Sequence, residues 1–501
     1  MRLPFPESIP FVPVFLFALL LCIIQQLQGT NPLFSLGCFA YILVATIAFN
    51  VAGGFTRPSG AYIFFNSVLG VIIGLCVKVY LDEAADSNLL SPVLTIGVYF
   101  FGMCMMLAAV YLSKRVRPKR ALMGKMVTDA NMQTATVGCL VAGILIYVIG
   151  YVIPGGNGSV LSALNQLNRF FPLAIILGVI NTIRRSGGTR SVNLPVLIAA
   201  GLMFITGLFG YSKEGMIAPF AAYALAAASQ RYRVSRAQIV VGIFATIFIF
   251  RYLVPYAQYG RNFRDESGAR NYEVSLSLLS NLGYVREQYL ESSADAYEER
   301  VLGYYNTPQG FFDRLQMISI DDALIHRTDQ FGFFGLSPMV GAFENIVPHF
   351  IWKDKPQGVI GNVWAHEVGM LADADESTGI SFSSTASTFH MAGWKGILLA
   401  AGTWFFLFLI FDSLCGDVRK TPWGLLVMVL FAHAAPEGDI TAIIYMCFYT
   451  VYAIVFAGIM GAYVTPIIGS FFIGPQGIMI RRGVRIRSIP SRLRPPVSPA
   501  T

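Results

Sequence analysis

Long apolar stretches constrain this chain more than any other feature of its sequence. Runs of about 20 apolar residues recur along it, and each is long enough to cross the hydrocarbon core of a bilayer as a helix. Hydrophobic residues make up 55% of the 501 positions and charged residues 13%, whereas an ordinary soluble domain carries about 25% charged residues. The sequence therefore predicts an all-α polytopic membrane protein embedded in a lipid bilayer.

We expect about twelve transmembrane helices. They cover roughly residues 10–26, 33–53, 60–81, 90–112, 134–153, 165–183, 193–210, 214–229, 237–256, 394–413, 422–435 and 440–463. The predicted organisation is a membrane bundle of about nine helices over 1–256, a large and partly helical outer loop domain over 257–392, about three helices over 393–465, and a basic tail over 466–501.

Basic residues gather in alternate connections between these spans. They occur at 114–125, 184–190, 231–236 and 419–420, and again in the tail from 481 onward. Because short cytoplasmic loops carry the excess of Lys and Arg, we expect both termini in the cytoplasm of a bacterium and the loop domain outside its inner membrane. The loop domain has about 9 basic and 18 acidic residues. The net charge of +8 thus reflects topology, and no nucleic-acid partner is predicted.

The cysteine pattern and the N-terminus add two expectations. All seven cysteines fall in predicted helices or beside their cytoplasmic ends, so no disulfide framework is predicted. The first apolar run lacks a basic leader and a small-residue cleavage site. We therefore interpret it as a retained helix.

Charged side chains at the ends of the predicted spans mark a candidate site, because such groups are costly in a membrane. With the orientation above, several of them converge at the outer leaflet: Arg169, Lys213, Glu214, Arg251, His433, Glu437 and Asp439. For each residue taken alone there is a purely structural alternative. A Lys or Arg near a helix end can extend to the membrane interface, Lys213 and Glu214 can form a local surface pair, and His433 can be a core histidine.

The predicted loop domain adds more cationic and imidazole groups, namely Arg261, Arg264, Arg314, His326, Arg327, His349, Lys353, Lys355, His366 and His390. Arg and Lys suit a pyrophosphate group, and a His or a carboxylate can accept a proton from a sugar hydroxyl. The stretch HEVGM at 366–370 lacks the second histidine of a zinc motif. The acids of DADE at 373–376 can bind a hard cation or simply be solvated. No metal or other cofactor is predicted.

Three stretches resemble the O-antigen polymerase family, also called oligosaccharide repeat-unit polymerases. GYSKEGMIAPFAAYALAA at 210–227 is similar to a short outer turn in which a basic residue precedes a new helix. FENIVPHFIWKDKP at 343–356 is similar to an amphipathic stretch that ends in Lys-Pro. STASTFHMAGWKGILLA at 384–400 resembles an aromatic-rich return into the membrane. The layout of helices and the long outer loop adds to the resemblance.

The chain also departs from the family pattern. The basic residue of the turn, often Arg in the family, is Lys213. Ser387 and Thr388 stand before Phe389, where an acidic residue is often found. No outer Arg is followed eleven residues later by Gly, a spacing found in some members.

The resemblance implies a membrane glycosyltransferase of the C-type fold, which moves a growing glycan from its polyprenyl-pyrophosphate carrier onto another carrier-linked repeat unit. It implies Lys213, Arg251 and Arg314 as contacts of the pyrophosphate and His366 or His390 as the base. The further residues expected to bind substrate are Arg169, Glu214, Arg264, Lys353 and Lys355. A chain-length regulator is a plausible protein partner.

Two other functions fit the sequence. An O-antigen ligase-like enzyme, which transfers a finished glycan to an acceptor, would share the fold and the outer loop. A polysaccharide flippase belongs to a different class, and such transporters usually have short loops and charged groups deep in a central cavity. The position of the charges at the outer face and the length of the outer segment favour the polymerase.

Overall fold

The computed structural model describes residues 1–126, 130–153, 167–263, 268–299, 303–310, 312–347, 351–352, 360–371, 373–376 and 378–473. Within these ranges the chain is helical, with no β-strand beyond an isolated bridge between Arg2 and Arg233. The predicted all-α class is therefore confirmed.

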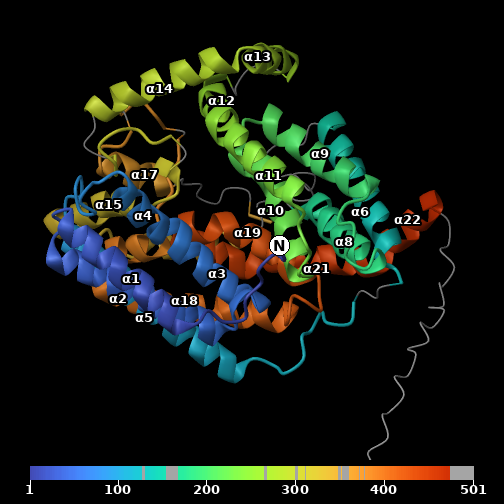
Figure 1. The fold of residues 1–501 in the computed structure, drawn as a ribbon, viewed down its shortest axis with the longest axis horizontal. Helices are drawn as coiled ribbons and strands as arrows, with labels where there is room; N and C mark the ends of the chain where they lie inside the picture. The colour runs from blue at the N-terminus through green and yellow to red at the C-terminus, as the bar shows by residue number, and fades with distance from the viewer. Residues whose placement is uncertain are drawn as a thin grey trace, which may run out of the picture.

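The helices follow one another along the whole described chain (Figure 1). In the first half they are α1 (Phe11–Leu27), α2 (Pro32–Ala52), α3 (Pro58–Ser67), α4 (Ile73–Tyr80), α5 (Pro92–Val116), α6 (Met132–Val152), α8 (Phe170–Arg185), α9 (Leu194–Phe209), α10 (Lys213–Ser229), α11 (Arg236–Phe248) and α12 (Val254–Gly260). In the second half they are α13 (Gly268–Ser280), α14 (Leu282–Glu299), α15 (Ile318–Phe331), α16 (Ser337–Glu344), α17 (Ile360–Glu367), α18 (Ser384–Cys415), α19 (Trp423–Glu437), α20 (Ile440–Tyr445), α21 (Val451–Ile459) and α22 (Thr465–Ile473).

Among the described residues, seven helices are long and apolar enough to cross a membrane. They are Pro32–Ala52, Pro58–Tyr80, Pro92–Val116, Met132–Gly150, Arg236–Phe263, Ser384–Cys415 and Ile440–Ile473. Three shorter apolar helices, α1, α9 and α19, coincide with further predicted spans. The helical membrane class is thus supported, while the count of about twelve spans and the separate outer domain stay predictions.

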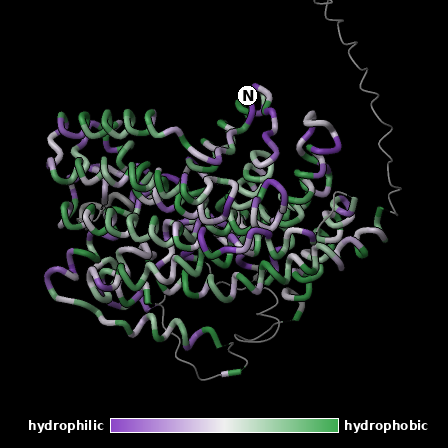
Figure 2. Tube along the Cα trace, turned by 90° about the horizontal axis from the view of Figure 1, so that it is seen from below, coloured by the Kyte–Doolittle hydropathy of each residue, from purple (hydrophilic) through white to green (hydrophobic). Residues whose placement is uncertain are grey.

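The apolar surface of the helices explains why such a chain needs a bilayer. α11 is apolar along its length and has no buried residue, so side chains such as Val241 and Phe244 are exposed. Figure 2 shows hydrophobic residues along most of the helical tube, with hydrophilic residues gathered mainly where the chain turns. An apolar helix without protein neighbours is stable when lipid covers it.

Several of the long helices contain irregular turns. π-helical turns interrupt three of them, as η2 (Val68–Ile72), η3 (Ile249–Leu253), η6 (Met446–Thr450) and η7 (Met460–Val464). α18 is broken at Ala392 and at Gly393, whose φ of 61° favours glycine. This break coincides with the predicted start of the C-terminal membrane segment at 393.

The segment between α12 and α18 divides into two parts (Figure 1). α13 and α14 lie at one edge of the molecule, beyond the end of α12. α15 and α17 lie beside α4 and the start of α18, so they cover one end of the bundle. This second part carries most of the described polar residues of the predicted loop domain.

Candidate functional site

Two neighbouring aspartates fix α15 to the membrane bundle. Asp322 accepts hydrogen bonds from the backbone N–H of Leu90 and of Ser91 and from Thr95 Oγ1 (2.7 Å), all at the start of α5. A carboxylate at a helix N-terminus is stabilised by the unpaired N–H groups there. Asp321 accepts hydrogen bonds from Tyr99 Oη and from the N–H of Ser383 (2.9 Å). α15 is therefore tied both to α5 and to the residue that caps α18.

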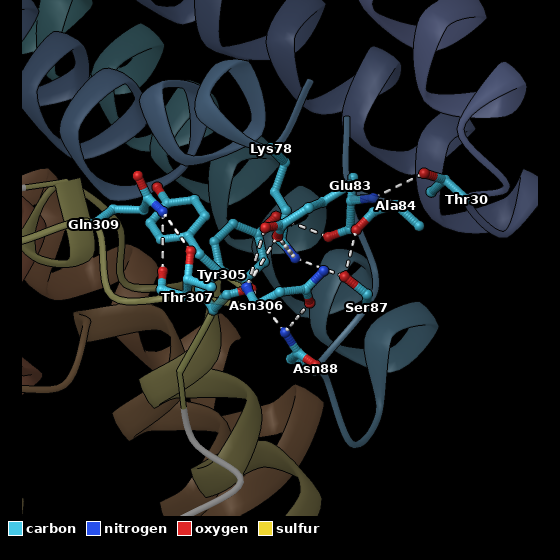
Figure 3. A network of polar contacts seen from close by, with 12 residues as sticks. Thr30, Lys78, Glu83, Ala84, Ser87, Asn88, Tyr305, Asn306, Thr307 and Gln309 are labelled. Carbon is cyan, nitrogen blue, oxygen red and sulfur yellow. Dashed lines mark hydrogen bonds and ion pairs between the residues drawn. The ribbon is translucent and has the colours of Figure 1, made fainter. Parts of the chain in front are cut away.

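A buried lysine fixes the segment 303–310 in a similar way (Figure 3). Lys78 Nζ donates to Glu83 Oε2 (2.7 Å) and to Ser87 Oγ (2.6 Å), and it lies 5.0 Å from the centre of the Tyr304 ring. The N–H of Asn306 donates to both carboxylate oxygens of Glu83 at 3.2 and 3.1 Å. This Lys78 cluster joins the end of α4 to the segment that leads into α15.

The burial of Asp321 gives a stability that depends on pH. Burial in an apolar environment raises the pKa of this carboxyl from 3.8 to about 6. Because the native state holds the proton more tightly than the unfolded chain does, native stability falls as the pH rises from about 4 to about 6. The loss amounts to about 2–3 kcal/mol. We expect the thermal midpoint of the detergent-solubilised protein to fall over this interval and then to level off.

Asp321→Asn is the matched variant for this pH dependence, because an amide resembles the protonated acid and cannot ionise. We expect its thermal midpoint to fall clearly less between pH 4 and pH 6. Burial also raises the pKa of Asp322. Part of the pH dependence of the thermal midpoint should therefore remain in the variant. An equal fall in both proteins would contradict the assignment to Asp321.

The first candidate group of side chains is built around His390, on the N-terminal part of α18. Its Nδ1 lies 2.8 Å from Thr328 Oγ1, and its Nε2 lies 3.4 Å from Glu367 Oε2. The second distance is that of an ion pair, and the atoms are not aligned as a hydrogen bond. The imidazole also packs against the rings of Phe334 and Trp364. These contacts surround the His390 ring and fix its position.

Accessibility differs sharply within this His390 group. The His390 side chain is 1% exposed, whereas Glu367 is 26% exposed and Arg327 29% exposed. Arg327 Nε lies 4.0 Å from Glu367 Oε2, and its guanidinium lies over the Phe331 ring. Of the two acid–base side chains, Glu367 is therefore the one that a substrate can contact. His390 lies behind it and Arg327 beside it.

His366, the other predicted base, is engaged with the backbone. Its Nε2 lies 2.9 Å from the carbonyl oxygen of Asp375. Asn362 donates to the same carbonyl, and the carboxylate of Asp375 accepts from the N–H of Thr378. His366 and Asp375 thus stabilise a turn. In the described part of the chain, no three His, Cys, Asp or Glu side chains gather as metal ligands would.

The second candidate group is formed by Glu214, His433 and Glu437. His433 Nε2 lies 3.8 Å from Glu214 Oε2, and its Nδ1 lies 3.7 Å from Glu437 Oε2. All three side chains are at least one third exposed. Arg169 lies within electrostatic range of Glu214, and its buried Nε has no hydrogen-bond partner among the described residues. This group confirms the predicted proximity of Glu214, His433 and Glu437.

The turn before α10 positions Glu214 through close packing. A Cβ on Gly207 would lie 2.5 Å from the backbone of Gly215, so only glycine allows α9 and α10 to approach this closely. Ser212 caps α10 by accepting from the N–H of Gly215 (3.0 Å). Tyr211 adopts a φ of 49°, and its buried ring packs on Tyr256. Packing thus holds a strained backbone at the turn that presents Lys213 and Glu214.

The turn between α19 and α20 connects the two groups. Asp439 caps α20 by accepting from the N–H of Ala442 (2.8 Å), so its carboxylate has a structural role. The N–H of Ile440 donates to Ser387 Oγ (3.2 Å), one helical turn before His390. Because Glu437 stands just before this turn, both groups lie at the same end of the bundle. A substrate that spans them would contact Glu367 of one group and Glu214 and His433 of the other.

The remaining predicted residues have separate positions. Arg251 is exposed within the π-helical turn η3, lies over the Tyr252 ring and forms no ion pair with any described residue. The backbone of Arg314 belongs to a 3-10 turn at Phe312–Arg314. Arg264, Lys353 and Lys355 lie outside the described residues, as does part of the 343–356 stretch.

Sequence reasoning overlooked Glu367 as a functional candidate. Its only local signal is the His-Glu pair at 366–367, whose pattern is that of an incomplete zinc motif.

Comparisons with protein-family models, with curated proteins and with solved structures found no match for this chain.

Proposed function

We propose that this protein polymerises oligosaccharide repeat units carried on polyprenyl pyrophosphate, at the outer face of a bacterial inner membrane. The observation that carries the proposal is the presence of two acid–histidine groups at one end of an apolar helical bundle, each with an arginine nearby. The sequence resemblance to repeat-unit polymerases supplies the substrate class. An apolar bundle suits lipid-borne substrates, because their chains can stay in the bilayer while their head groups reach its end.

The reaction needs one base and one site for an anionic leaving group. A hydroxyl oxygen of the acceptor sugar bonds to the anomeric carbon of the donor glycan. The bond from that carbon to the pyrophosphate oxygen breaks, and polyprenyl pyrophosphate leaves with the electron pair. The hydroxyl proton passes to a carboxylate or an imidazole on the protein.

Glu367 is the base that we propose, because it is the acid–base side chain of the His390 group that is open to solvent, at 26% exposed against 1% for His390. His390 and Arg327 would orient its carboxylate, as the third member of a catalytic group orients a base. Arg169 and Lys213, beside the Glu214–His433 group, are proposed to bind the pyrophosphate, whose charge their cations would offset. These roles differ from the expectation that His366 or His390 is itself the base.

A deletion strain tests the proposed function most directly. Its lipid-linked and surface glycans are separated on a gel beside those of the parent strain and of a strain complemented with this chain. We expect long chains to disappear and single repeat units to accumulate both on the carrier and on the cell surface. Complementation should restore the long chains.

Other gel profiles would point elsewhere. Full-length polymer accumulating on its carrier would identify a ligase. Single repeat units that accumulate on the carrier and never appear on the cell surface would identify a flippase. A profile identical to that of the parent would refute the glycan proposal altogether.

A further inference from the structure

A basic hollow lies away from both candidate groups, where the N-terminus meets two connections of the bundle. It has a volume of about 510 Å³, within the size range of small-ligand pockets. Four arginines line it, namely Arg2, Arg184, Arg231 and Arg233, together with Ile183, Gly187, Gly188, Gln230 and Tyr232. They come from the N-terminus, the last turn of α8 and the α10–α11 connection. None of the described residues that line the hollow is acidic.

Backbone pairing holds the arginines together. Arg2 and Arg233 face each other in an isolated antiparallel bridge, flanked by hydrogen bonds from the N–H of Leu3 to the carbonyl of Tyr232 (3.0 Å) and from the N–H of Val234 to the carbonyl of Met1 (2.8 Å). Figure 1 shows the N-terminus beside α10. Like charges directly opposite each other across such a pair are destabilising. The fold therefore places two exposed cations side by side, where a bound anion would offset their repulsion.

The third arginine stands on a strained backbone. Arg231 has a φ of 51°, a conformation that is costly for a side chain other than Gly, Asn or Asp. In the described part of the chain, Arg2, Arg231 and Arg233 form no ion pair. Arg184 donates from Nε to Gln230 Oε1 (3.0 Å) and from Nη2 to the carbonyl of Arg419 (3.4 Å). Neither the backbone nor a neighbouring acid among the described residues accounts for an arginine at position 231, whereas an anionic ligand would.

We propose that this hollow binds a phosphate-bearing anion. Guanidinium groups match phosphate oxygens with paired N–H donors, and four of them can surround one phosphate group. The hollow lies where α8 and α10 end, among the loops whose basic residues predict the cytoplasmic side. A general excess of Arg in cytoplasmic loops explains their number. It does not explain their convergence from three segments into one hollow whose described lining has no acid.

The test uses the full-length protein purified in a neutral detergent and titrated in a calorimeter with three probes. The probes are a short-chain phosphatidylglycerol, the matching phosphatidylcholine and inorganic phosphate. The test variant combines Arg2→Gln with Arg231→Asn, since Asn tolerates the left-handed backbone and so preserves the turn. Arg190→Gln is the control, because Arg190 is exposed in the same α8–α9 connection and does not line the hollow.

We expect phosphatidylglycerol to bind the wild type and the control equally, and the double variant at least about tenfold more weakly, which equals about 1.4 kcal/mol. Phosphatidylcholine should bind weakly to all three proteins. Binding of inorganic phosphate with the same dependence on the variants would also support the site and identify its ligand as a soluble phosphate. Equal binding of phosphatidylglycerol to all three proteins, or no binding of any probe to the wild type, would overturn the proposal. Because the proposed catalytic groups are unchanged, this outcome is independent of the glycan profile.

Discussion

Replacing Glu367 by Gln is expected to reduce the yield of long glycan by at least about 100-fold, because a positioned general base contributes about 10²–10⁴-fold to a rate. The amide keeps the size of the side chain and its place beside His390 and Arg327, while it loses the ability to accept the proton. Lipid-linked single repeat units should accumulate instead. The measurement is the gel profile of a deletion strain that expresses the variant at the wild-type level.

The control for this variant is Glu376→Gln, which removes an exposed carboxylate from the same region of the chain. Among the described residues Glu376 forms no ion pair, and its loss should leave the chain-length profile unchanged. A normal profile for Glu367→Gln would exclude Glu367 as the base, whatever the deletion strain shows. A partial profile for Glu367→Asp would support it, because the shorter acid retains the chemistry at an altered distance.

His390 has a different expected role, and a variant can distinguish it. His390→Gln keeps a polar side chain near Thr328, and it removes the imidazole that faces Glu367. If His390 orients Glu367, the variant should lower the rate of polymer formation at an unchanged protein level, since the carboxylate would lose the neighbour that fixes its position. A loss of polymer that only follows a reduced protein level would indicate a purely structural histidine.

The membrane helices could be predicted because their signal is local. Length and apolar composition decide whether a helix can cross a bilayer, and both can be counted in the sequence. The ends were harder to predict. The long helix that begins at Arg236 continues to Phe263, and the last long helix continues to Ile473. Their predicted ends were residues 256 and 463. The helices run further because semi-apolar residues at a helix end can be helical on either side of the membrane interface.

The Glu214–His433 pair could be predicted for a similar reason. Both residues stand at the end of an apolar helix, and helix ends on one side of a membrane share a layer. Arg251 was expected in the same group, but it is exposed and forms no ion pair with Glu214 or with any other described acid. It stands within a π-helical turn, where the wider turn alters the angular positions of side chains, and a residue-by-residue count at about 100° per residue does not anticipate that shift.

The His390 group could not be predicted as a unit. Arg327, Glu367 and His390 stand on three different helices, and no spacing rule links them. What brings them together is the set of contacts that fixes α15 to α5 through Asp321 and Asp322. These aspartates look like ordinary surface acids in the sequence, so the geometry of the site depends on interactions that carry no local signature.

The Lys78 cluster provides the strongest test of how the bundle holds this region in place. Lys78 is completely buried and Glu83 is 8% exposed. Removing one member of a buried ion pair typically costs about 3–5 kcal/mol, because the other charge is left without compensation. Lys78→Met, which preserves the length of the side chain, should therefore lower the unfolding free energy by about that amount. Unfolding in mixed micelles with increasing SDS would measure it.

Two further variants separate the charge from the packing. Lys78→Met combined with Glu83→Gln removes both charges, and it should recover most of the lost stability, since a neutral replacement of a buried pair is often tolerated. Lys125→Met removes an exposed lysine and should change stability by no more than about 0.5 kcal/mol. In the Lys78→Met variant a protease should also cut the segment 303–310 faster. The hydrogen bonds from the N–H of Asn306 to the Glu83 carboxylate hold this segment, and in the variant that carboxylate has lost its cation. If Lys78→Met were as stable as Lys125→Met, the ion pair would have no part in holding α15 and its functional side chains in place.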